Sequence, residues 1–184
     1  MAAGVRVSSG GRRMSDARQL DPESLGDHVD RLYRAAWGLC GSREDAEDLV
    51  QETFARVLRK PRLLRSDDDI GYLLRVLRNT FISSRRAVAR RPAEVLAGED
   101  LELMAGSERD TADRWVDSNE LYGAISALPP DFRDALIAVD LVGLSYREAG
   151  RALKVPEATI TTRLHRARQR IVRSLAIRQD EQRS

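Results

Sequence analysis

The spacing of apolar residues restricts this chain to helices. Apolar residues recur in steps of three and four, which is the spacing of one face of an α-helix. The stretches with this spacing are 25–39, 46–58, 73–81, 115–128, 132–142 and 160–171. Glycine or proline closes several of them, at Gly41, Pro61 and Gly143, as expected where a helix stops. Ser42 follows the first stop and can cap the next helix. We therefore expect an all-α protein in which these stripes are buried, Val29 and Leu58 included.

Two polar residues mark the start of one helix. Ser145 and Glu148 have the spacing of a capping box, in which each side chain accepts a hydrogen bond from the backbone N–H of the other residue. The letters KVP then break this helix, and Pro156 suits the first turn of the next one. The pattern predicts a helix-turn-helix. Gly150 lowers the helix propensity by up to about 1 kcal/mol relative to alanine, so we expect it to soften the turn.

The second helix of this pair presents a polar face. Ile160, Leu164, Ala167 and Ile171 form its expected buried stripe. The residues left facing outward are Thr159, Thr161, Thr162, Arg163, His165, Arg166 and Arg170. An arginine fork fits O6 and N7 of guanine, threonine suits the thymine methyl group, and further arginines suit phosphate. The pattern predicts a DNA-reading helix; the alternative is a solvated charged face.

The composition excludes several classes of protein. The 184 residues are 42% hydrophobic and 33% charged, which fits a soluble chain of one domain or two small ones. The single cysteine, Cys40, excludes an intramolecular disulfide, and the apolar runs fall short of the roughly 20 residues of a membrane span. The N-terminus is rich in Gly, Ser and Arg and lacks the apolar core of a signal peptide. We expect a cytoplasmic protein whose N-terminus is disordered, with Met14 as a second candidate start.

Charge is unevenly distributed, although the net charge is only +2. No acid lies between Gly71 and Ala93, so the helix expected over about 70–90 is basic, whereas acids dominate from Glu94 to Glu120. This reversal of sign indicates a linker between two domains. The expected divisions are a disordered extension at 1–20, a first domain at 21–92, a flexible acidic linker at 93–112, a second domain at 113–178 and a polar tail at 179–184.

Three motifs occur in a characteristic order. They read DAEDLVQETFARVL (45–58), LLRVLRNTFISSRR (73–86) and LPPDFRDALIAVDLVGLSYREAGRAL (128–153), with TRLHRAR (162–168) behind the last. In this order they resemble the extracytoplasmic-function (ECF) sigma factors, the small two-domain class of bacterial transcription initiation factors. The chain departs from the family at Ala149–Gly150, which is usually isoleucine-alanine, and at Ala158–Thr159, which is usually glycine-threonine. These differences bear on the turn and on the promoter sequence read.

The resemblance implies an alternative sigma factor with no catalytic residues of its own. Such a protein binds core RNA polymerase and promoter DNA, and members of the family are often held by an anti-sigma factor. The second domain would read the minus-35 element through the outward residues of the helix-turn-helix. The first would dock on the clamp helices of the polymerase through Asp45, Glu47, Asp48, Gln51 and Glu52. Without the resemblance, these acids read as residues that stabilise the first turns of a helix.

The basic third helix resembles the element that captures the melted minus-10 strand. The resemblance places a base-binding asparagine at Asn79, while arginines hold phosphates and an aromatic ring offers a stacking face. The residues implied are Tyr72, Arg75, Arg78, Asn79, Arg85 and Arg86, whereas Phe81 is expected in the core. The acidic linker resembles the segment that threads toward the RNA exit path, and a solvated tether is the alternative.

Two further functions compete with this interpretation. A free-standing helix-turn-helix regulator would use the first domain for dimerisation or ligand binding, but it leaves the DAEDLVQETF motif unexplained. A magnesium phosphohydrolase could use Glu44, Asp45, Glu47 and Asp48 with the acids at 67–69, but it leaves both arginine-rich helices unexplained. Cys40 is expected to be a packed apolar residue. His28 and His165 lie far apart in the sequence and no glycine-rich phosphate loop occurs, so no cofactor and no metal site is expected.

Overall fold

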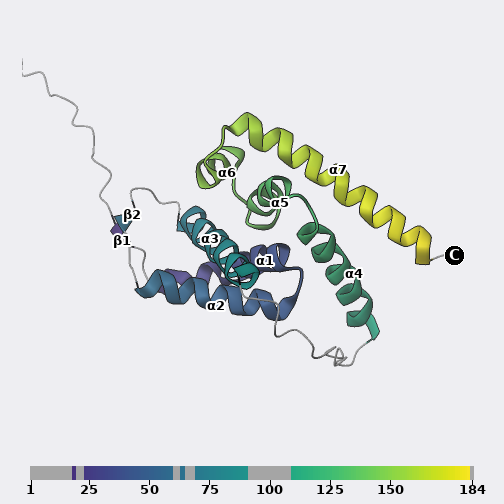
Figure 1. The fold of residues 1–184 in the computed structure, drawn as a ribbon, viewed down its shortest axis with the longest axis horizontal. Coiled ribbons are helices and arrows are strands. Elements are labelled where there is room, and N and C mark those ends of the chain that lie inside the picture. Colours follow the sequence, from purple (N-terminus) through teal and green to yellow (C-terminus); the bar gives the residue numbers. More distant parts are fainter. Residues whose placement is uncertain (1–17, 20–22, 60–62, 65–68, 91–108, 183–184) are drawn as a thin grey trace, which may run out of the picture.

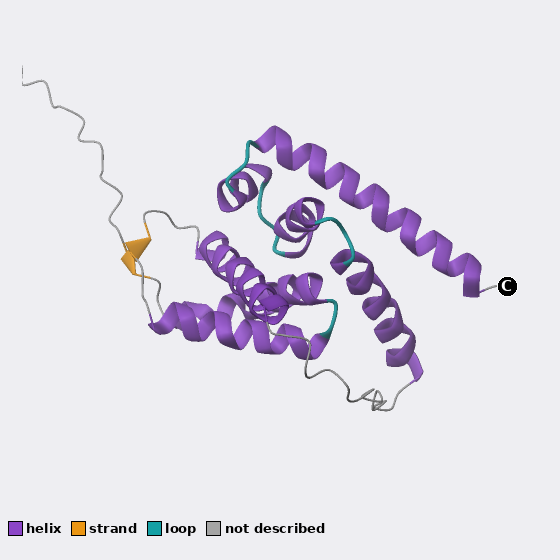
Figure 2. Cartoon of the chain, viewed as in Figure 1, coloured by secondary structure: helices purple, strands orange, loops and turns teal. Residues whose placement is uncertain are grey.

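The structure, a computed structural model, describes residues 18–19, 23–59, 63–64, 69–90 and 109–182. Most of the predicted acidic linker therefore lies outside the described residues, as does the predicted extension up to residue 17. The described part is almost entirely helical, which confirms the all-α prediction (Figures 1 and 2). The exception is a two-residue antiparallel pair that sequence analysis did not anticipate, in which Arg18 lies opposite Leu64 and Gln19 opposite Leu63.

The N-terminal bundle consists of a 3-10 turn and three helices. These are η1 (Glu23–His28), α1 (Val29–Cys40), α2 (Arg43–Arg59) and α3 (Asp69–Arg90). Gly41 ends α1 in the left-handed conformation with φ of 82°, and the hydroxyl of Ser42 accepts a hydrogen bond from the backbone N–H of Asp45 at 3.2 Å. These observations confirm the predicted end of α1 at Gly41 and the predicted cap of α2 at Ser42. Leu32, Leu73 and Leu77 are fully buried among the three helices.

Two expected core positions are exposed. Val29 is 39% exposed because η1 winds as a 3-10 helix, so the helical spacing does not run unbroken from Leu25 to Val29. Leu58 is 51% exposed because it lies 100° around α2 from the buried Val57. Thr53 occupies a buried position on this helix, and its hydroxyl donates to the Leu49 carbonyl at 2.7 Å.

The C-terminal bundle contains the predicted helix-turn-helix. Its elements are α4 (Arg109–Ser126), α5 (Pro130–Leu136), the π-helical turn η2 (Ile137–Leu141), α6 (Tyr146–Leu153) and α7 (Glu157–Gln182). The capping box is confirmed: the Glu148 N–H donates to the Ser145 hydroxyl at 3.3 Å, and the Ser145 N–H donates to the Glu148 carboxylate at 2.8 Å. The Ser145 hydroxyl also donates to the Glu148 carboxylate at 2.6 Å, and this hydrogen bond, together with the one from the Ser145 N–H, lowers the pKa of Glu148. The predicted stripe of Ile160, Leu164, Ala167 and Ile171 is buried.

Two helices of this bundle extend beyond the predicted domain boundaries. Helix α4 begins at Arg109, inside the predicted linker, and α7 runs to Gln182, inside the predicted tail. Both additions are polar stretches in the sequence: Asp110 suits the first turn of α4, and the end of α7 consists largely of good helix formers. The helix expected over 132–142 changes at Ile137 from α to π geometry, where the Val142 N–H donates to the Ile137 carbonyl at 2.9 Å.

Gly150 does the opposite of what its helix propensity suggested. A Cβ atom at this position would lie 2.8 Å from the carbonyl oxygen of Val155, closer than side chains approach backbone oxygens. The Val155 N–H donates to the Gly150 carbonyl at 3.0 Å, so the chain folds back directly over this residue. Gly150 therefore tightens the turn of the helix-turn-helix rather than softening it.

We expect Gly150→Ala to lower the free energy of unfolding by about 1–3 kcal/mol, because the added methyl group must displace backbone. Gly123→Ala is the matched control: a Cβ there meets nothing within 4 Å, so the change should raise stability by up to about 1 kcal/mol through helix propensity. Urea unfolding followed by circular dichroism measures both. Equal effects of the two substitutions would contradict the tight turn.

The two bundles contact each other. Helix α1 lies against α4 and η2, and α3 lies against α6 (Figure 1). The sequence predicted two domains but gave no indication of a contact between them.

Candidate nucleic-acid and polymerase interfaces

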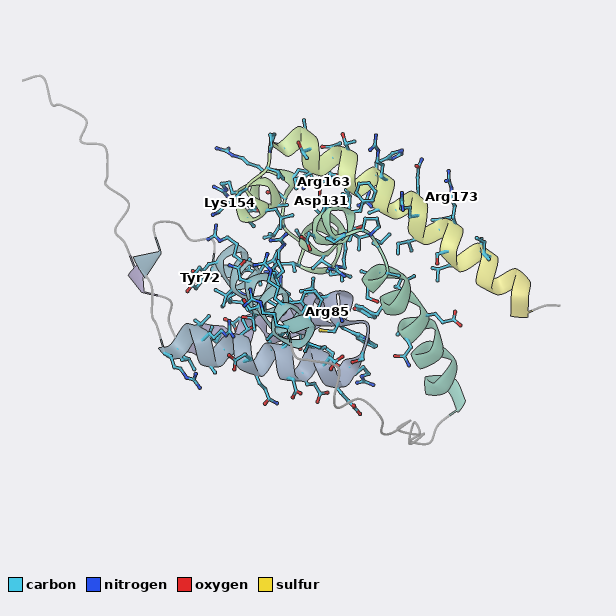
Figure 3. All side chains as sticks on the ribbon, in the orientation of Figure 1. Tyr72, Arg85, Asp131, Lys154, Arg163 and Arg173 are labelled. Atoms are coloured by element: carbon cyan, nitrogen blue, oxygen red, sulfur yellow. The ribbon has the colours of Figure 1, made fainter. Side chains whose placement is uncertain are left out.

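Helix α7 presents most of the predicted DNA-reading side chains to solvent. Because its buried stripe faces α4, α5 and α6, the opposite face is open along the first turns. Thr161, Thr162, His165, Arg166 and Arg170 are exposed, while Thr159 and Arg163 are partly buried. Figure 3 shows polar side chains projecting from the outer face of this helix. The arrangement suits a helix placed in a DNA groove.

Two arginines of this set also make contacts within the C-terminal bundle. The Nη2 atom of Arg163 lies 2.6 Å from the Asp131 carboxylate, and the Arg163 side chain is only 23% exposed (Figure 3). The guanidinium of Arg170 lies over the Phe132 ring, 5.2 Å from its centroid. Arg166 is exposed, so it is the arginine of this set best placed to read a base.

Basic residues at the turn were missed by sequence reasoning. Arg147, Arg151 and Lys154 surround an open hollow between α6 and the start of α7. Lys154 itself adopts the left-handed conformation with φ of 58°. All three are exposed, so they can reach a DNA backbone beside the first turn of α7. The available signal was the position of Arg147 and Arg151 on α6, opposite the buried Ala149 and Ala152, with Lys154 directly after the helix.

Helix α3 carries the predicted minus-10 residues in two environments. Asn79, Arg85 and Arg86 are exposed, whereas Tyr72, Arg75 and Arg78 are half-buried. Tyr72 packs against the core with part of its surface open (Figure 3). Phe81, expected in the core, is only partly buried, and the Arg133 guanidinium lies 5.2 Å from its centroid. Arg78 Nε donates to the Asp134 carboxylate at 2.5 Å, across the boundary between the bundles.

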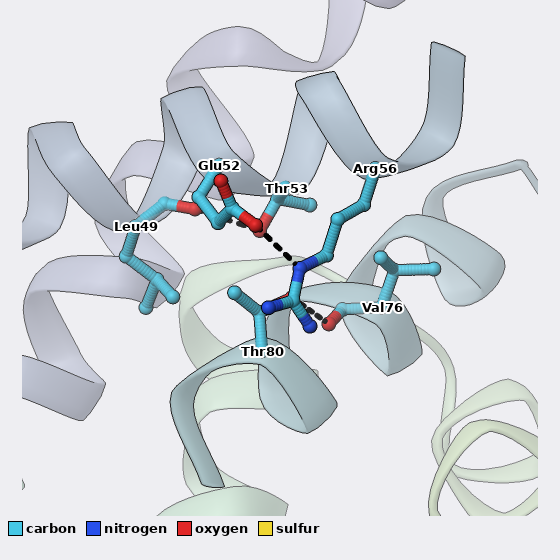
Figure 4. A network of polar contacts seen from close by, with 6 residues as sticks. All are labelled: Leu49, Glu52, Thr53, Arg56, Val76 and Thr80. Atoms are coloured by element: carbon cyan, nitrogen blue, oxygen red, sulfur yellow. Dashed lines mark hydrogen bonds and ion pairs between the residues drawn. The ribbon is translucent and has the colours of Figure 1, made fainter. Parts of the chain in front are cut away.

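Helix α2 exposes the predicted polymerase-binding residues. Asp45, Glu47, Asp48 and Gln51 are exposed on the side opposite its buried stripe. Glu52 is half-exposed and accepts a hydrogen bond from Arg56 Nε at 2.6 Å, which lowers the pKa of its carboxyl group (Figure 4). Helix α2 therefore presents an acidic surface in which Asp48 is central and Glu52 shares its charge with a neighbour.

The described residues show no arrangement for catalysis by a metal. None of them forms a group of three or more His, Cys, Asp or Glu side chains able to hold a metal ion. The Cys40 thiol is half-buried, and burial, helped by the nearby Asp45, raises its pKa to about 12. A thiol in this state is a packed residue rather than a nucleophile. Among the described helices, none is long and apolar enough to cross a membrane.

Known proteins match both bundles. Residues 25–91 match the family Sigma-70 region 2, and residues 118–171 match the family Sigma-70, region 4. ECF RNA polymerase sigma factor EcfG of Rhodopseudomonas palustris is 33% identical over 144 residues, which cover 78% of each chain. The chain belongs to the ECF family of RNA polymerase sigma factors. Members of this family initiate transcription and are not enzymes. Membership therefore rules out the magnesium phosphohydrolase hypothesis and disfavours the hypothesis of a free-standing regulator.

Two further comparisons agree with membership of the ECF family. ECF RNA polymerase sigma factor SigE of Mycolicibacterium smegmatis is 38% identical over 152 residues; the match covers 81% of this chain but 59% of that relative's length. Sigma factor RpoE of Bartonella quintana, solved in complex with the anti-sigma factor NepR, superposes with a TM-score of 0.63 at 26% identity. That match covers 85% of this chain and 99% of RpoE.

Proposed function

We propose that this ECF sigma factor binds core RNA polymerase through α2, holds the minus-10 strand on α3 and reads the minus-35 element with α7. The observation that supports this division most directly is the separation of charge. The exposed face of α2 is acidic, whereas α3 beyond Asp69 and the outer face of α7 are predominantly basic. An acidic face suits a basic protein helix, and basic faces suit phosphates.

The two DNA-binding helices are suited to different forms of DNA. Helix α7 follows a short capped helix and a tight turn, the arrangement that places a helix in the major groove of a duplex. Helix α3 combines an exposed amide at Asn79 with the ring of Tyr72 and several arginines, groups that fit an unstacked base and its backbone. The domains 21–92 and 113–178 are proposed on this basis as the minus-10 and minus-35 modules.

The partners and location are part of the same proposal. A protein that works with RNA polymerase and bacterial promoters acts in the cytoplasm. Since RpoE of Bartonella quintana is bound by an anti-sigma factor, we propose an anti-sigma protein as a regulator of this chain as well. We also propose that the acidic linker threads toward the RNA exit path of the polymerase.

Asn79→Ala tests the role of α3. Because Asn79 is exposed, its loss should leave the fold intact while impairing promoter opening and base discrimination at one minus-10 position. A base edge left without its partner typically costs about 1–3 kcal/mol, which is roughly 5- to 150-fold. Permanganate footprinting of promoter complexes measures opening, and minus-35 duplex affinity is the control. An unchanged opening profile would show that Asn79 does not read a base.

A further inference from the structure

Helix α5 begins beside α7, and two neighbouring residues there each contact an arginine of α7. The Asp131 carboxylate lies 2.6 Å from Arg163 Nη2, and the Arg170 guanidinium lies 5.2 Å from the centroid of the Phe132 ring. Arg163 and Arg170 are seven positions apart, which is about two turns, so both lie on the same flank of α7. Figure 3 shows Asp131 and Arg163 close together where the two helices meet. The start of α5 therefore contacts the flank of the helix that is proposed to read DNA.

The two contacts leave different charges on α7. Asp131 carries a full negative charge, so it neutralises Arg163, whose side chain is only 23% exposed. The Phe132 ring carries no net charge, so the exposed Arg170 keeps its positive charge for a DNA phosphate. Arg163 therefore meets DNA as one half of a neutral pair, whereas Arg170 meets it as a cation.

The position of Asp131 is fixed by the backbone around it. The N–H groups of Phe132 and Arg133 both donate to the Pro129 carbonyl at 3.0 Å. Arg133 Nη1 also donates to the Ser126 carbonyl at 3.0 Å, which ties the start of α5 to the end of α4. Because an aspartate side chain is short and its backbone is held in this way, the carboxylate stays at the flank of α7.

Arg163 is placed to reach the DNA backbone rather than a base edge. Around α7 it lies between the buried Ile160 and Ala167 on one side and the exposed Arg166 on the other. A side chain on the flank of a helix in the major groove points to the wall of the groove, where the phosphates lie. Since phosphates occur at every site, such a contact would strengthen binding to DNA of any sequence.

The ion pair and one phosphate contact are of similar strength. A phosphate contact raises affinity by about fivefold at 0.15 M salt, given a slope of about 0.9 per contact. An exposed ion pair changes an equilibrium constant by up to about fivefold. The Asp131 side chain is 62% exposed, so its pair with Arg163 falls in this range. A pair of this strength is enough to offset the gain from one phosphate.

We propose that Asp131 is a positioning residue that withholds Arg163 from the DNA backbone and so sets the strength of minus-35 binding one phosphate contact lower. The proposal rests on the proposed role of α7 in reading that element. Asp131 acts through Arg163 and not on DNA itself. Base reading stays with the outer face of α7, where Arg166 lies.

The test uses the full chain bound to core RNA polymerase and a duplex carrying a promoter that this complex transcribes. Asp131→Asn removes the charge and keeps the size of the side chain. Glu157→Gln is the matched control, because it removes one exposed acid at the start of α7 without altering the partner of Arg163. Filter binding over a series of potassium chloride concentrations measures the affinity and its salt slope. Circular dichroism establishes that each variant remains folded.

The expected result is a gain of affinity that depends on Arg163. Asp131→Asn should bind the promoter duplex about fivefold more tightly at 0.15 M salt, and its slope of log affinity against log salt should be steeper by about 0.9. The base preference at each minus-35 position should stay that of wild type. Adding Arg163→Ala to Asp131→Asn should abolish the gain, because the two residues act as a unit. Any effect of Glu157→Gln should be the same with and without Arg163.

Three results would overturn the proposal. An unchanged salt slope in Asp131→Asn would show that Arg163 takes no phosphate when released, and a new base preference would show that it reads a base instead. A gain that persists in the double variant with Arg163→Ala would show that the carboxylate repels DNA directly. None of these results removes the proposed function of α7. That function fails separately if the wild-type complex binds the promoter no better than the same duplex with its minus-35 element scrambled.

Discussion

A variant that carries both Asp48→Lys and Glu52→Lys is expected to lose its binding to core RNA polymerase. The two residues are four apart on the exposed side of α2, outside the stripe that contains Leu49 and Val50. If this face meets a basic helix, reversal replaces attraction by repulsion on the scale of several kcal/mol, or at least about 100-fold in affinity. Co-elution with core polymerase at low and moderate salt measures the loss.

The structure determines how that result is controlled. Glu52 already pairs with Arg56, so its reversal also removes an intrahelical ion pair, and a solvent-exposed pair of this kind contributes little to helix stability. Asp48→Lys alone leaves the Glu52–Arg56 pair intact and should account for a large share of the loss of affinity for core polymerase. Asp27→Lys with Asp30→Lys changes the net charge equally on exposed positions of η1 and α1. Retention of the α2 double variant at wild-type levels would show that these acids do not form the polymerase surface.

Arg166→Ala should weaken promoter duplex binding by about 1–3 kcal/mol, roughly 5- to 150-fold, and relax one position of the minus-35 element. Arg166 is exposed on the open face of α7 and is the candidate for a guanine contact. Arg163→Ala should cost less, because Arg163 must first leave Asp131. If either arginine contacts phosphate instead, its loss should flatten the slope of log affinity against log salt by about 0.9 without changing sequence preference.

Fluorescence anisotropy with a promoter duplex and its single-base variants separates these cases. Arg34→Ala serves as the control, since Arg34 is exposed on α1 and donates to the backbone of its own helix. Wild-type affinity in both α7 variants, with the fold intact, would remove this helix from minus-35 recognition.

Local patterns in the sequence predicted local structure well. The Ser145–Glu148 capping box, the Gly41 stop and the Ser42 cap all involve residues a few positions apart, and all are present in the structure. The stripe of α7 was predicted correctly because a long regular helix keeps its spacing. The same spacing failed where the winding changes. It wrongly placed Val29 in the core after the 3-10 turn η1, and it did not predict the π geometry of η2.

Contacts between distant residues could not be predicted in this way. The sequence around Asp134 does not indicate its ion pair with Arg78, 56 positions away, and the sequence around Trp37 does not indicate its stacking on Tyr122. Gly150 was misjudged because helix propensity takes no account of the Val155 carbonyl that folds back onto it. The roles of α2 and α3 came from resemblance to a family, since acids at a helix start and arginines on a helix face each have ordinary structural explanations.

Reconstituted transcription tests the central claim most directly. Purified chain is added to core RNA polymerase on genomic DNA of the source bacterium, and the 5′ ends of the transcripts are sequenced. If the chain is the promoter-specificity subunit proposed here, it should create a discrete set of starts absent with core alone. These starts should share two upstream elements at a fixed spacing and should disappear with the Asp48→Lys and Glu52→Lys variant. Starts indistinguishable from those of core polymerase alone would contradict the account.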